Sequence, residues 1–473
     1  AVMRWKSTCC VLHSRHIHCQ VHVPMASARG EFSSRFGFIM AAAGSAVGLG
    51  NIWGFPTQAA SNGGAAFVFV YLVLAFTLAY PALMAELILG RHAHANAVTA
   101  LAGISERPLT RRLGISSGII GFIVASLILS FYAIVAGWMM AHCLGSLAAL
   151  FGADGAAQWL TEFGFLRNLV FMLFFMLLTV AIISAGVRDG IERWSSRLMP
   201  MLIITLVALV IYVMTMDGAA QGLRVYLLPD FEAALSPKLI ISALGSAFFS
   251  LSLGVGTMLI YGSYISDSEN LPIAGGLVTA VDIGIAVLAG FLVLPAMYVA
   301  LNNGVAIFAE NGALLSEDTL IFTVLPELFS TMGIAGNIVS FTFFALMAVA
   351  ALTSSISMLE VPVAYTIENH GVSRHHAVIT IGVAISVVSL IVLLNFEALF
   401  GLIIAFTTRY SQPLLGFVFC IYVGWIWHRD SLLQELRKGA PDIENTLFWK
   451  IWPWHLRVVC PAMILLIFVQ SLR

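Results

Sequence analysis

Long apolar runs repeat along the chain, separated by short segments that carry glycine, proline and charge. Eleven such runs occupy residues 36–60, 65–90, 116–150, 168–187, 198–216, 238–266, 272–302, 335–368, 376–395, 398–427 and 455–472. Crossing a bilayer as an α-helix takes roughly 20 apolar residues. The pattern predicts an all-α polytopic membrane protein with eleven transmembrane helices, several of them tilted or extended beyond the bilayer.

Lysine and arginine gather in alternate connections between these runs. Five precede the first run, four follow the second, three follow the fourth and four lie between the tenth and the eleventh. The positive-inside rule therefore predicts a cytoplasmic N-terminus and a multi-pass protein of the cell inner (plasma) membrane. The acidic connection 303–334 fits the outer face.

The composition narrows the function classes. The chain is 60% hydrophobic and 10% charged, and its formal net charge is −1. No basic patch or nucleic-acid motif is present, so a nucleic-acid partner is excluded. No nucleophile or metalloprotease motif occurs, which argues against an enzyme. The histidines at 142, 370, 375 and 376 lie near span ends, where we expect solvated interface residues.

The first residues stand apart from the rest of the chain. Cys9, Cys10 and Cys19 lie among four histidines, but their spacing matches no zinc template. The segment also lacks the apolar core of a signal peptide. Met25 opens a stretch that looks like a natural start. We expect residues 1–28 to be a cytoplasmic extension, with 1–24 disordered or artefactual.

The first and sixth runs share an interruption. The first contains "GSAVGLGN" and the sixth contains "FFSLSLGVG". Small residues also allow close packing of ordinary helices, which is the alternative explanation for each run alone. Two interrupted spans five spans apart instead indicate an inverted-repeat transporter, in which unwound backbone lines a binding site. The transporter core would then be 29–427, with spans 1–5 and 6–10 as repeats, followed by a cytoplasmic loop and the eleventh span in 428–473.

Several motifs resemble one family. "SSRFGFIMAAAGSAVGLGNIWGFP", "NGGAAFVFVY", "PALMAELILGR", "AFFSLSLGVG" with "YGSY", and "ALTSSISMLEVPVAY" occur in order between about Arg29 and Trp425. Together they resemble the bacterial kind of neurotransmitter:sodium symporter. The resemblance implies the LeuT-type fold, an inverted five-helix repeat with broken first and sixth spans. It also implies a substrate and two sodium ions bound midway through the bilayer.

The resemblance carries particular sodium ligands onto this chain. The first sodium would take its oxygens from Ala46, Asn51, Ser250, Asp282 and the substrate carboxylate. The second would take carbonyls of Gly44, Val47 and Ala350 and hydroxyls of Thr353 and Ser354. Hydroxyls in the middle of a membrane helix also commonly bond to their own backbone, which is the alternative for Thr353 and Ser354.

The resemblance also implies a substrate site. The backbone N–H groups of Leu49 and Gly50, at the positive end of a half-helix, would meet a carboxylate together with the Tyr132 hydroxyl. Carbonyls of Ser45, Ala46, Phe249 and Ser250 would meet the ammonium. The substrate side chain would contact a mostly apolar lining of Ile128, Tyr132, Phe249, Ser252, Val255, Ser354 and Met358. Amine-carrying relatives place an aspartate at the position of Gly48, so an α-amino acid is favoured.

Asp282 distinguishes this chain from chloride-dependent relatives. Those relatives have an asparagine here and a serine one turn later, where this chain has Ala286. Tyr71 and Ser250 match chloride-site members, whereas Ser246 replaces their usual glutamine. We therefore predict transport that needs no chloride, with Asp282 neutralising the sodium.

The gates follow the family only in part. Arg29 and Glu368 match an inner gate pair, with Tyr264 behind them, and Glu360 offers Arg29 a second partner. Glu86 would accept hydrogen bonds from N–H groups freed by the broken sixth span. The outer ion pair of relatives is absent, because Gly54 and Ile404 stand at its two positions. Arg409 either replaces the lost arginine at the outer vestibule or serves carbonyls at a helix break near Pro413.

Taken together, the sequence predicts a sodium-coupled secondary active symporter. It would import a neutral, hydrophobic or aromatic, α-amino acid by alternating access, as a monomer or homodimer. The altered outer gate leaves an alternative open, a transport-defective relative that acts as an amino-acid sensor. Accumulation of substrate against a gradient separates the two.

Overall fold

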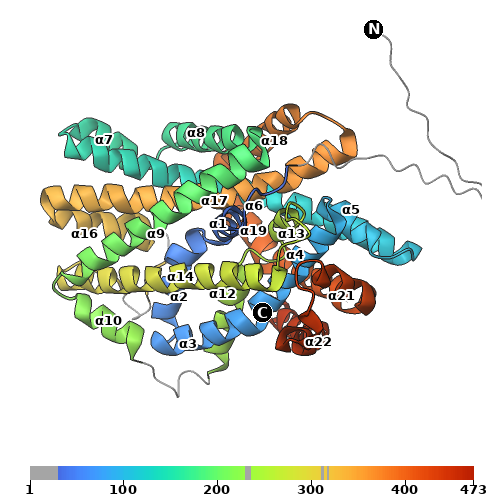
Figure 1. Cartoon of the computed structure of the whole chain (residues 1–473). Helices are drawn as coiled ribbons and strands as arrows, with labels where there is room; N and C mark the ends of the chain where they lie inside the picture. The colour runs from blue at the N-terminus through green and yellow to red at the C-terminus, as the bar shows by residue number, and fades with distance from the viewer. Residues whose placement is uncertain (1–29, 229–235, 310–313, 317–318, 473) are drawn as a thin grey trace, which may run out of the picture.

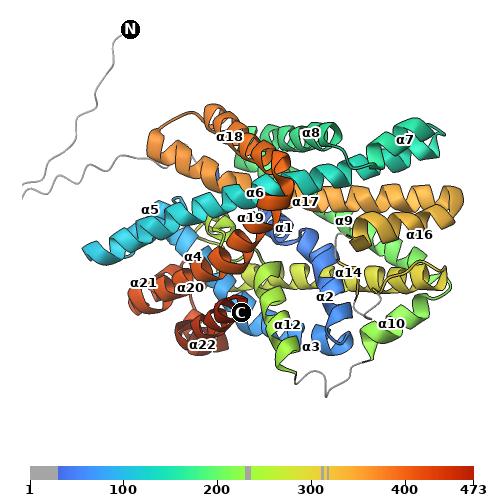
Figure 2. The ribbon, with the colours of Figure 1, turned by 180° about the vertical axis from the view of Figure 1, so that it is seen from behind.

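The computed structural model describes residues 30–228, 236–309, 314–316 and 319–472, and within these ranges the chain is a bundle of helices (Figures 1 and 2). The extension with its cysteines and histidines lies outside the described residues. Eight helices are long and apolar enough to cross a membrane. Two bent helix pairs, Arg35–Ala46 with Gly50–Ser61 and Phe396–Ile426 with Arg429–Arg437, raise the number to as many as ten in the described part of the chain. The short helices Pro237–Ser250 and Thr257–Gly262 lie where the sixth of the eleven spans is predicted.

The first span is broken as its glycines predict. It consists of α1 (Arg35–Ala46), the π-helical turn η2 (Gly50–Gly54) and α2 (Phe55–Ser61). Ser34 caps α1 by accepting from the N–H of Gly37, and α1 ends where Val47 becomes extended. The two halves are bent by 62°. Backbone groups that leave the helical ladder at this depth must find partners other than lipid.

The sixth span is broken in the same way. It consists of α12 (Pro237–Ser250) and α13 (Thr257–Gly262), joined by the non-helical residues 251–256. Three residues of this connection, Ser252, Gly254 and Gly256, have positive φ. The carboxylate of Glu86, on α4, accepts a hydrogen bond of 2.7 Å from the N–H of Gly254. Glu86 therefore satisfies one of the backbone donors that the break releases.

The remaining helices extend further than the apolar runs predict. The third span, expected from 116, already begins at Pro108, and the eleventh, expected from 455, begins at Leu447. These first turns carry arginine, lysine and tryptophan, which suit the membrane interface.

The remaining elements are α3 (Ala65–Leu74), η3 (Ala75–Ala79), α4 (Tyr80–Ala93), α5 (Ala97–Gly103), α6 (Pro108–Leu150), α7 (Asp154–Thr161), α8 (Phe165–Ser184), η4 (Val187–Glu192), α9 (Arg193–Met214), α10 (Ala219–Leu227), α14 (Leu271–Asn302), η5 (Leu320–Val324), α16 (Leu325–Thr331), α17 (Gly333–His370), α18 (Arg374–Leu394), α19 (Phe396–Ile404), η6 (Ala405–Ser411), α20 (Gln412–Ile421), η7 (Tyr422–Ile426), α21 (Arg429–Arg437), η8 (Ile443–Asn445) and α22 (Leu447–Ser471).

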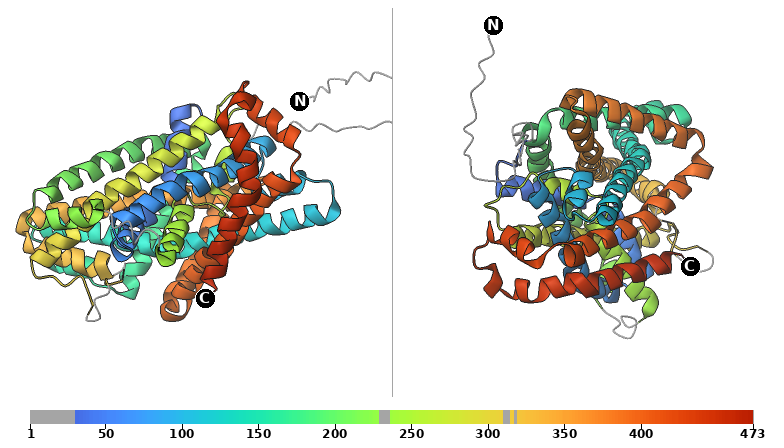
Figure 3. Two further views of the ribbon diagram at one scale, coloured as in Figure 1. Left: turned by 90° about the horizontal axis from the view of Figure 1, so that it is seen from below. Right: turned by 90° about the vertical axis from the view of Figure 1, so that its right-hand side faces the viewer.

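The broken helices lie inside the bundle. α1 packs against α9, α14 and α17, and α6 packs along α17 on the other side of the site. α20 and α22 pack together at the edge of the bundle, beside α4 (Figures 2 and 3). Every residue of α1 from Gly37 to Ala46 is buried. The helix that carries the opening glycines is therefore enclosed by protein and does not face lipid.

His142 does not lie at a solvated interface as expected. It is 3% exposed, and Nη2 of the buried Arg167 lies 3.1 Å from its Nδ1. Arg167 also donates to Leu160 and Asn168, and its guanidinium lies over the ring of Phe163. α7 and α8 fold back over the end of α6 and cover His142, which the hydropathy pattern does not reveal. The other three histidines, at 370, 375 and 376, are exposed.

A buried ion pair ties α21 to the bundle. Arg91 and Glu435 are almost fully buried, and Nε of Arg91 lies 2.7 Å from Oε1 of Glu435. Burial by itself raises the pKa of Glu435, but His92, Lys438 and Arg91 lower it to about 2. The carboxylate is therefore ionised at neutral pH, and its charge is compensated by these cations.

We expect Glu435→Gln to destabilise the protein strongly. Removing one member of a buried pair leaves the other charge uncompensated, which costs about 3–5 kcal/mol. Thermal unfolding of the purified protein measures the effect. The matched control is Glu444→Gln, which breaks an exposed pair with Arg437 and should cost about 0–1 kcal/mol. Equal losses in the two variants would contradict the assigned role of Glu435.

Candidate functional site

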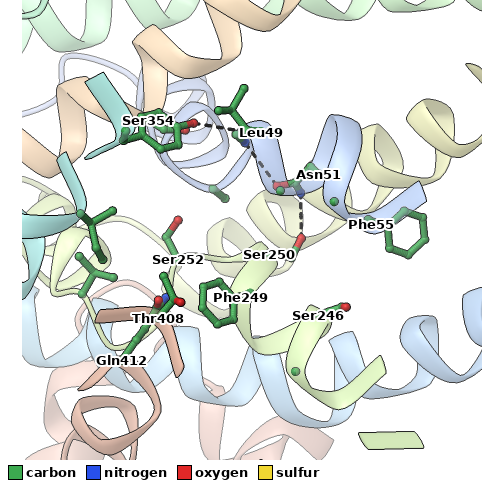
Figure 4. Close-up of a pocket in the computed structure, with 18 of the residues that line it drawn as sticks. Leu49, Asn51, Phe55, Ser246, Phe249, Ser250, Ser252, Ser354, Thr408 and Gln412 are labelled. Atoms are coloured by element: carbon green, nitrogen blue, oxygen red, sulfur yellow. Dashed lines mark hydrogen bonds between the residues drawn. The ribbon is translucent and has the colours of Figure 1, made fainter. Parts of the chain in front are cut away.

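A cavity of 560 Å³ lies between the two broken spans (Figure 4). Of the twelve residues expected to bind substrate, all but Ser45 line it, together with Asn51 from the expected first sodium site. Ser45 is buried beside the cavity, where its carbonyl accepts a hydrogen bond from the Ser252 hydroxyl. Residues from α1, η2, α6, α12, α17 and the connection 251–256 thus meet at one place, although they are far apart in the sequence.

The start of η2 points backbone donors at this cavity. The N–H of Leu49 donates to the Tyr132 hydroxyl at 3.3 Å. Gly48 leaves little space here, because a Cβ at this position would lie 2.9 Å from the Tyr132 hydroxyl and 3.0 Å from that of Ser354. An aspartate at position 48 would therefore collide with both groups. This end of the cavity combines the Leu49 N–H, at the start of a helical turn, with a phenol, a combination that suits a carboxylate.

Asp282 is the centre of a buried polar cluster. Its carboxylate accepts from the Asn51 amide at 2.7 Å and from the Ser250 hydroxyl at 2.6 Å. The Asn51 amide also donates to Ser250, and the Tyr71 hydroxyl donates to Ser250 at 2.9 Å. Asp282 is 0% exposed. Amide and hydroxyl groups are thus gathered around one carboxylate, and no lysine or arginine pairs with it among the described residues.

A second cluster joins α1 to α17. The Ser354 hydroxyl donates to the carbonyls of Val47 and Gly44, at 3.0 and 3.3 Å. The Thr353 hydroxyl donates to Ala350 at 3.0 Å, and a Cβ on Gly44 would lie 3.1 Å from that of Thr353. All five residues expected at the second sodium site therefore lie together. Their oxygens come from hydroxyls and carbonyls, with no fixed charge.

The positions of the family's outer gate carry no charge in this chain. Gly54, Ile404 and Ser246, which stand at the positions of a charged and polar gate in relatives, all line the cavity. Gly54 and Ile404 also line a neighbouring cavity of 970 Å³. Seven aromatic residues line this second cavity, namely Trp53, Trp138, Phe163, Phe165, Phe322, Phe396 and Phe400. The boundary between the two cavities consists of backbone and aliphatic side chains.

The inner gate differs in detail from the expectation. Arg29 lies outside the described residues, and the Glu368 carboxylate accepts two hydrogen bonds from Asn96. The Tyr264 hydroxyl donates to Glu360, and so does the guanidinium of Arg374, at 2.6 and 3.0 Å. Sequence reasoning missed Arg374, because a basic residue at the start of an exposed helix carries no signal of a buried partner.

Arg409 matches neither of its two expected roles. Its side chain is exposed and lines neither cavity, and its guanidinium forms no hydrogen bond or ion pair with the described residues. The reason is local. The chain forms the π-helical turn η6 over Ala405–Ser411, and the residues that face the cavity are Ile404, Thr408 and Gln412. Thr408 and Gln412 are therefore cavity residues that the sequence reasoning missed.

Comparisons with known proteins agree with this architecture. The model of the sodium:neurotransmitter symporter family matches residues 29–164 and 156–473. The uncharacterized sodium-dependent transporter YhdH of Bacillus subtilis is 33% identical over 93% of this chain and 97% of its own length. The human sodium- and chloride-dependent GABA transporter 2 is 27% identical over 60% of this chain and 54% of its own length.

A solved structure of a similar protein has the same fold. MhsT, crystallised in complex with L-phenylalanine, superposes with a TM-score of 0.80 and 34% sequence identity, covering 94% of this chain and all of MhsT. The predicted fold is confirmed, and the protein is an integral membrane transporter coupled to sodium, not an enzyme. The chain belongs to the sodium:neurotransmitter symporter family.

Proposed function

We propose that the protein imports a neutral, hydrophobic or aromatic α-amino acid, driven by two sodium ions and without chloride. The observation that carries this proposal is the cavity at the two breaks. One end offers the Leu49 N–H and the Tyr132 hydroxyl to a carboxylate, while the walls are mainly apolar. MhsT, to which this chain is similar, was crystallised with L-phenylalanine, which supports an amino-acid substrate for this protein.

The two polar clusters are the proposed sodium sites. In the first, Asp282 supplies the negative charge that a chloride ion supplies in chloride-dependent relatives, beside Asn51 and Ser250. In the second, Thr353 and Ser354 present hydroxyls next to the Gly44 and Val47 carbonyls. The helix break connects the sites, because Ala46 ends α1 and Val47 follows it in the chain, while their carbonyls would serve different ions. Binding of both ions would hold α1 against α14 and α17.

Uptake into proteoliposomes tests the function. The purified protein is reconstituted, and uptake of labelled phenylalanine is followed with an inward sodium gradient and with potassium in its place. The common amino acids are then added as competitors. We expect accumulation only with sodium, and strongest competition by neutral apolar amino acids. Binding of ligand without accumulation would instead indicate a sensor, and equal uptake with chloride replaced by gluconate would support the proposed chloride independence.

Val255 offers a test of the substrate pocket. It is 2% exposed and lines the cavity. We expect Val255→Phe to weaken competition by phenylalanine about tenfold or more. The larger side chain would take up space that the substrate ring needs, and such overpacking costs about 1–3 kcal/mol. Competition by alanine should change little, since its side chain does not reach as far. Val255→Ala is the control, because it enlarges the pocket and should not weaken competition by phenylalanine. If Val255→Phe weakened competition by phenylalanine and by alanine equally, the pocket assignment would be contradicted.

A further inference from the structure

Three cations surround a small pocket at the end of the bundle that carries α21. The pocket has a volume of 240 Å³ and lies between η7, α21 and the first turns of α22. Arg429, Lys450 and Arg457 line it, together with Trp427 and Trp454. All three cations are exposed, and none of them forms an ion pair with a carboxylate in the described part of the chain. The pocket therefore carries a concentrated positive charge.

The helical spacing of α22 builds one side of this pocket. Lys450, Trp454 and Arg457 are separated by four and three residues, so they share one face of the helix. Gly424 of η7 allows this face to come close, because a Cβ there would lie only 3.1 Å from Cα of Arg457. The pocket is thus a product of close packing between the tenth and eleventh spans.

Aromatic side chains hold two of the cations in place. The guanidinium of Arg457 lies 4.3 Å from the ring centroid of Trp425, and that of Arg429 lies 5.4 Å from the ring of Trp449. The Trp425 indole also donates to the Arg457 carbonyl. Tryptophan is enriched at membrane interfaces, where its ring is apolar and its N–H is wet. The pocket therefore lies at headgroup level.

An apolar stripe leads away from the pocket along α22. Ile451, Trp454, Val458 and Leu465 follow one face of the helix and are 45–61% exposed. This stripe faces outward from the bundle, and its length along the helix suits acyl chains. A soluble anion would bind the three cations but would make no contact with the apolar stripe.

We propose that this pocket binds the phosphate of an anionic glycerophospholipid, with the acyl chains along α22. Basic pockets between transmembrane helices bind such headgroups. The phosphate would lie among Arg429, Lys450 and Arg457, where charge-assisted hydrogen bonds are strongest. A bound lipid would bridge α21 and α22, and its phosphate would place one negative charge among the three cations. The pocket is separate from the substrate cavity, so the inference does not depend on the proposed substrate.

Native mass spectrometry of the whole protein tests the site. The protein is extracted in mild detergent and titrated with phosphatidylglycerol or phosphatidylcholine. We expect one phosphatidylglycerol to be retained in preference to phosphatidylcholine. Each single change, Arg429→Gln, Lys450→Gln or Arg457→Gln, should weaken retention about fivefold, as expected for one basic residue near an anionic lipid. Sodium and substrate binding by the same variants establishes that they are folded.

The control removes three positive charges elsewhere, more than any of the single changes in the pocket. Arg107, Arg111 and Arg112 are exposed at the start of α6, and the triple change of these residues to glutamine should leave the retained lipid unaffected. An equal loss in this control would show nonspecific surface attraction and overturn the proposal. Displacement of the lipid by glycerol phosphate at the same concentration would assign the pocket to a soluble anion and would also overturn it.

Discussion

Replacing Asp282 by alanine should abolish sodium-dependent uptake. The change removes the only fixed negative charge of the proposed first sodium site and leaves the Asn51 amide and the Ser250 hydroxyl without their acceptor. Charge-assisted hydrogen bonds contribute about 1.5–3 kcal/mol each, so we expect sodium affinity to fall about 100-fold or more. Sodium titration of substrate binding to the purified protein measures this directly.

The double variant Asp282→Asn with Ala286→Ser separates charge from structure. It keeps hydrogen-bonding groups at the cluster and reproduces the residues found in chloride-dependent relatives. We expect it to bind substrate only when chloride is present, whereas the unmodified protein is indifferent to chloride. Unchanged sodium dependence in Asp282→Ala would contradict the assignment of this cluster to sodium.

Replacing Gly254 by alanine should remove most of the folded, active protein. Gly254 has a φ of +80°, and a Cβ there would lie 2.1 Å from the carbonyl oxygen of Gln412 on α20. A left-handed conformation costs a non-glycine residue about 1–2 kcal/mol, and the contact with backbone adds to it. The break would have to move away from α20, which would also disturb the hydrogen bond from Gly254 to Glu86.

Gly256→Ala is a matched control within the same break. Gly256 has a φ of +86°, but a Cβ there meets nothing closer than 3.9 Å. It should therefore show only the conformational cost. Yield by fluorescence-detected size exclusion and substrate affinity of the folded fraction are the two measurements. Similar losses in the two variants would mean that backbone strain, and not the contact with α20, determines the effect.

The proposed substrate site and the outer-gate positions differ in how closely they match the family pattern. The end of the cavity proposed to meet the substrate carboxylate consists of backbone N–H groups and the Tyr132 hydroxyl. Changes of side chain in η2 leave these backbone groups in place. The positions of the family's outer gate are occupied by Gly54, Ile404 and Ser246, and these three residues cannot form an ion pair with one another. Closure would then depend on apolar contact with the aromatic residues of the neighbouring cavity. Loss of both gate charges together avoids leaving one of them buried without a partner.

Much of this protein could be predicted from the sequence because the membrane imposes strong constraints. Apolar runs separated by charge determined the eleven spans, and the glycines of "GSAVGLGN" and "FFSLSLGVG" determined where two of them break. Backbone in lipid must be helical unless it lines a site. The residues expected at the cavity and at both polar clusters came from the resemblance to the family, position by position along its motifs.

Only the tertiary structure decided which side chains meet across spans. Arg374 pairs with Glu360, Arg91 with Glu435, and Arg167 covers His142, and none of these pairs leaves a pattern in the sequence. The direction of Arg409 was also undecidable, because a single π-helical turn changes which residues of the tenth span face the cavity. Hydropathy reports how deep a residue lies in the membrane, whereas its partners depend on the rotation and packing of helices that are distant in the chain.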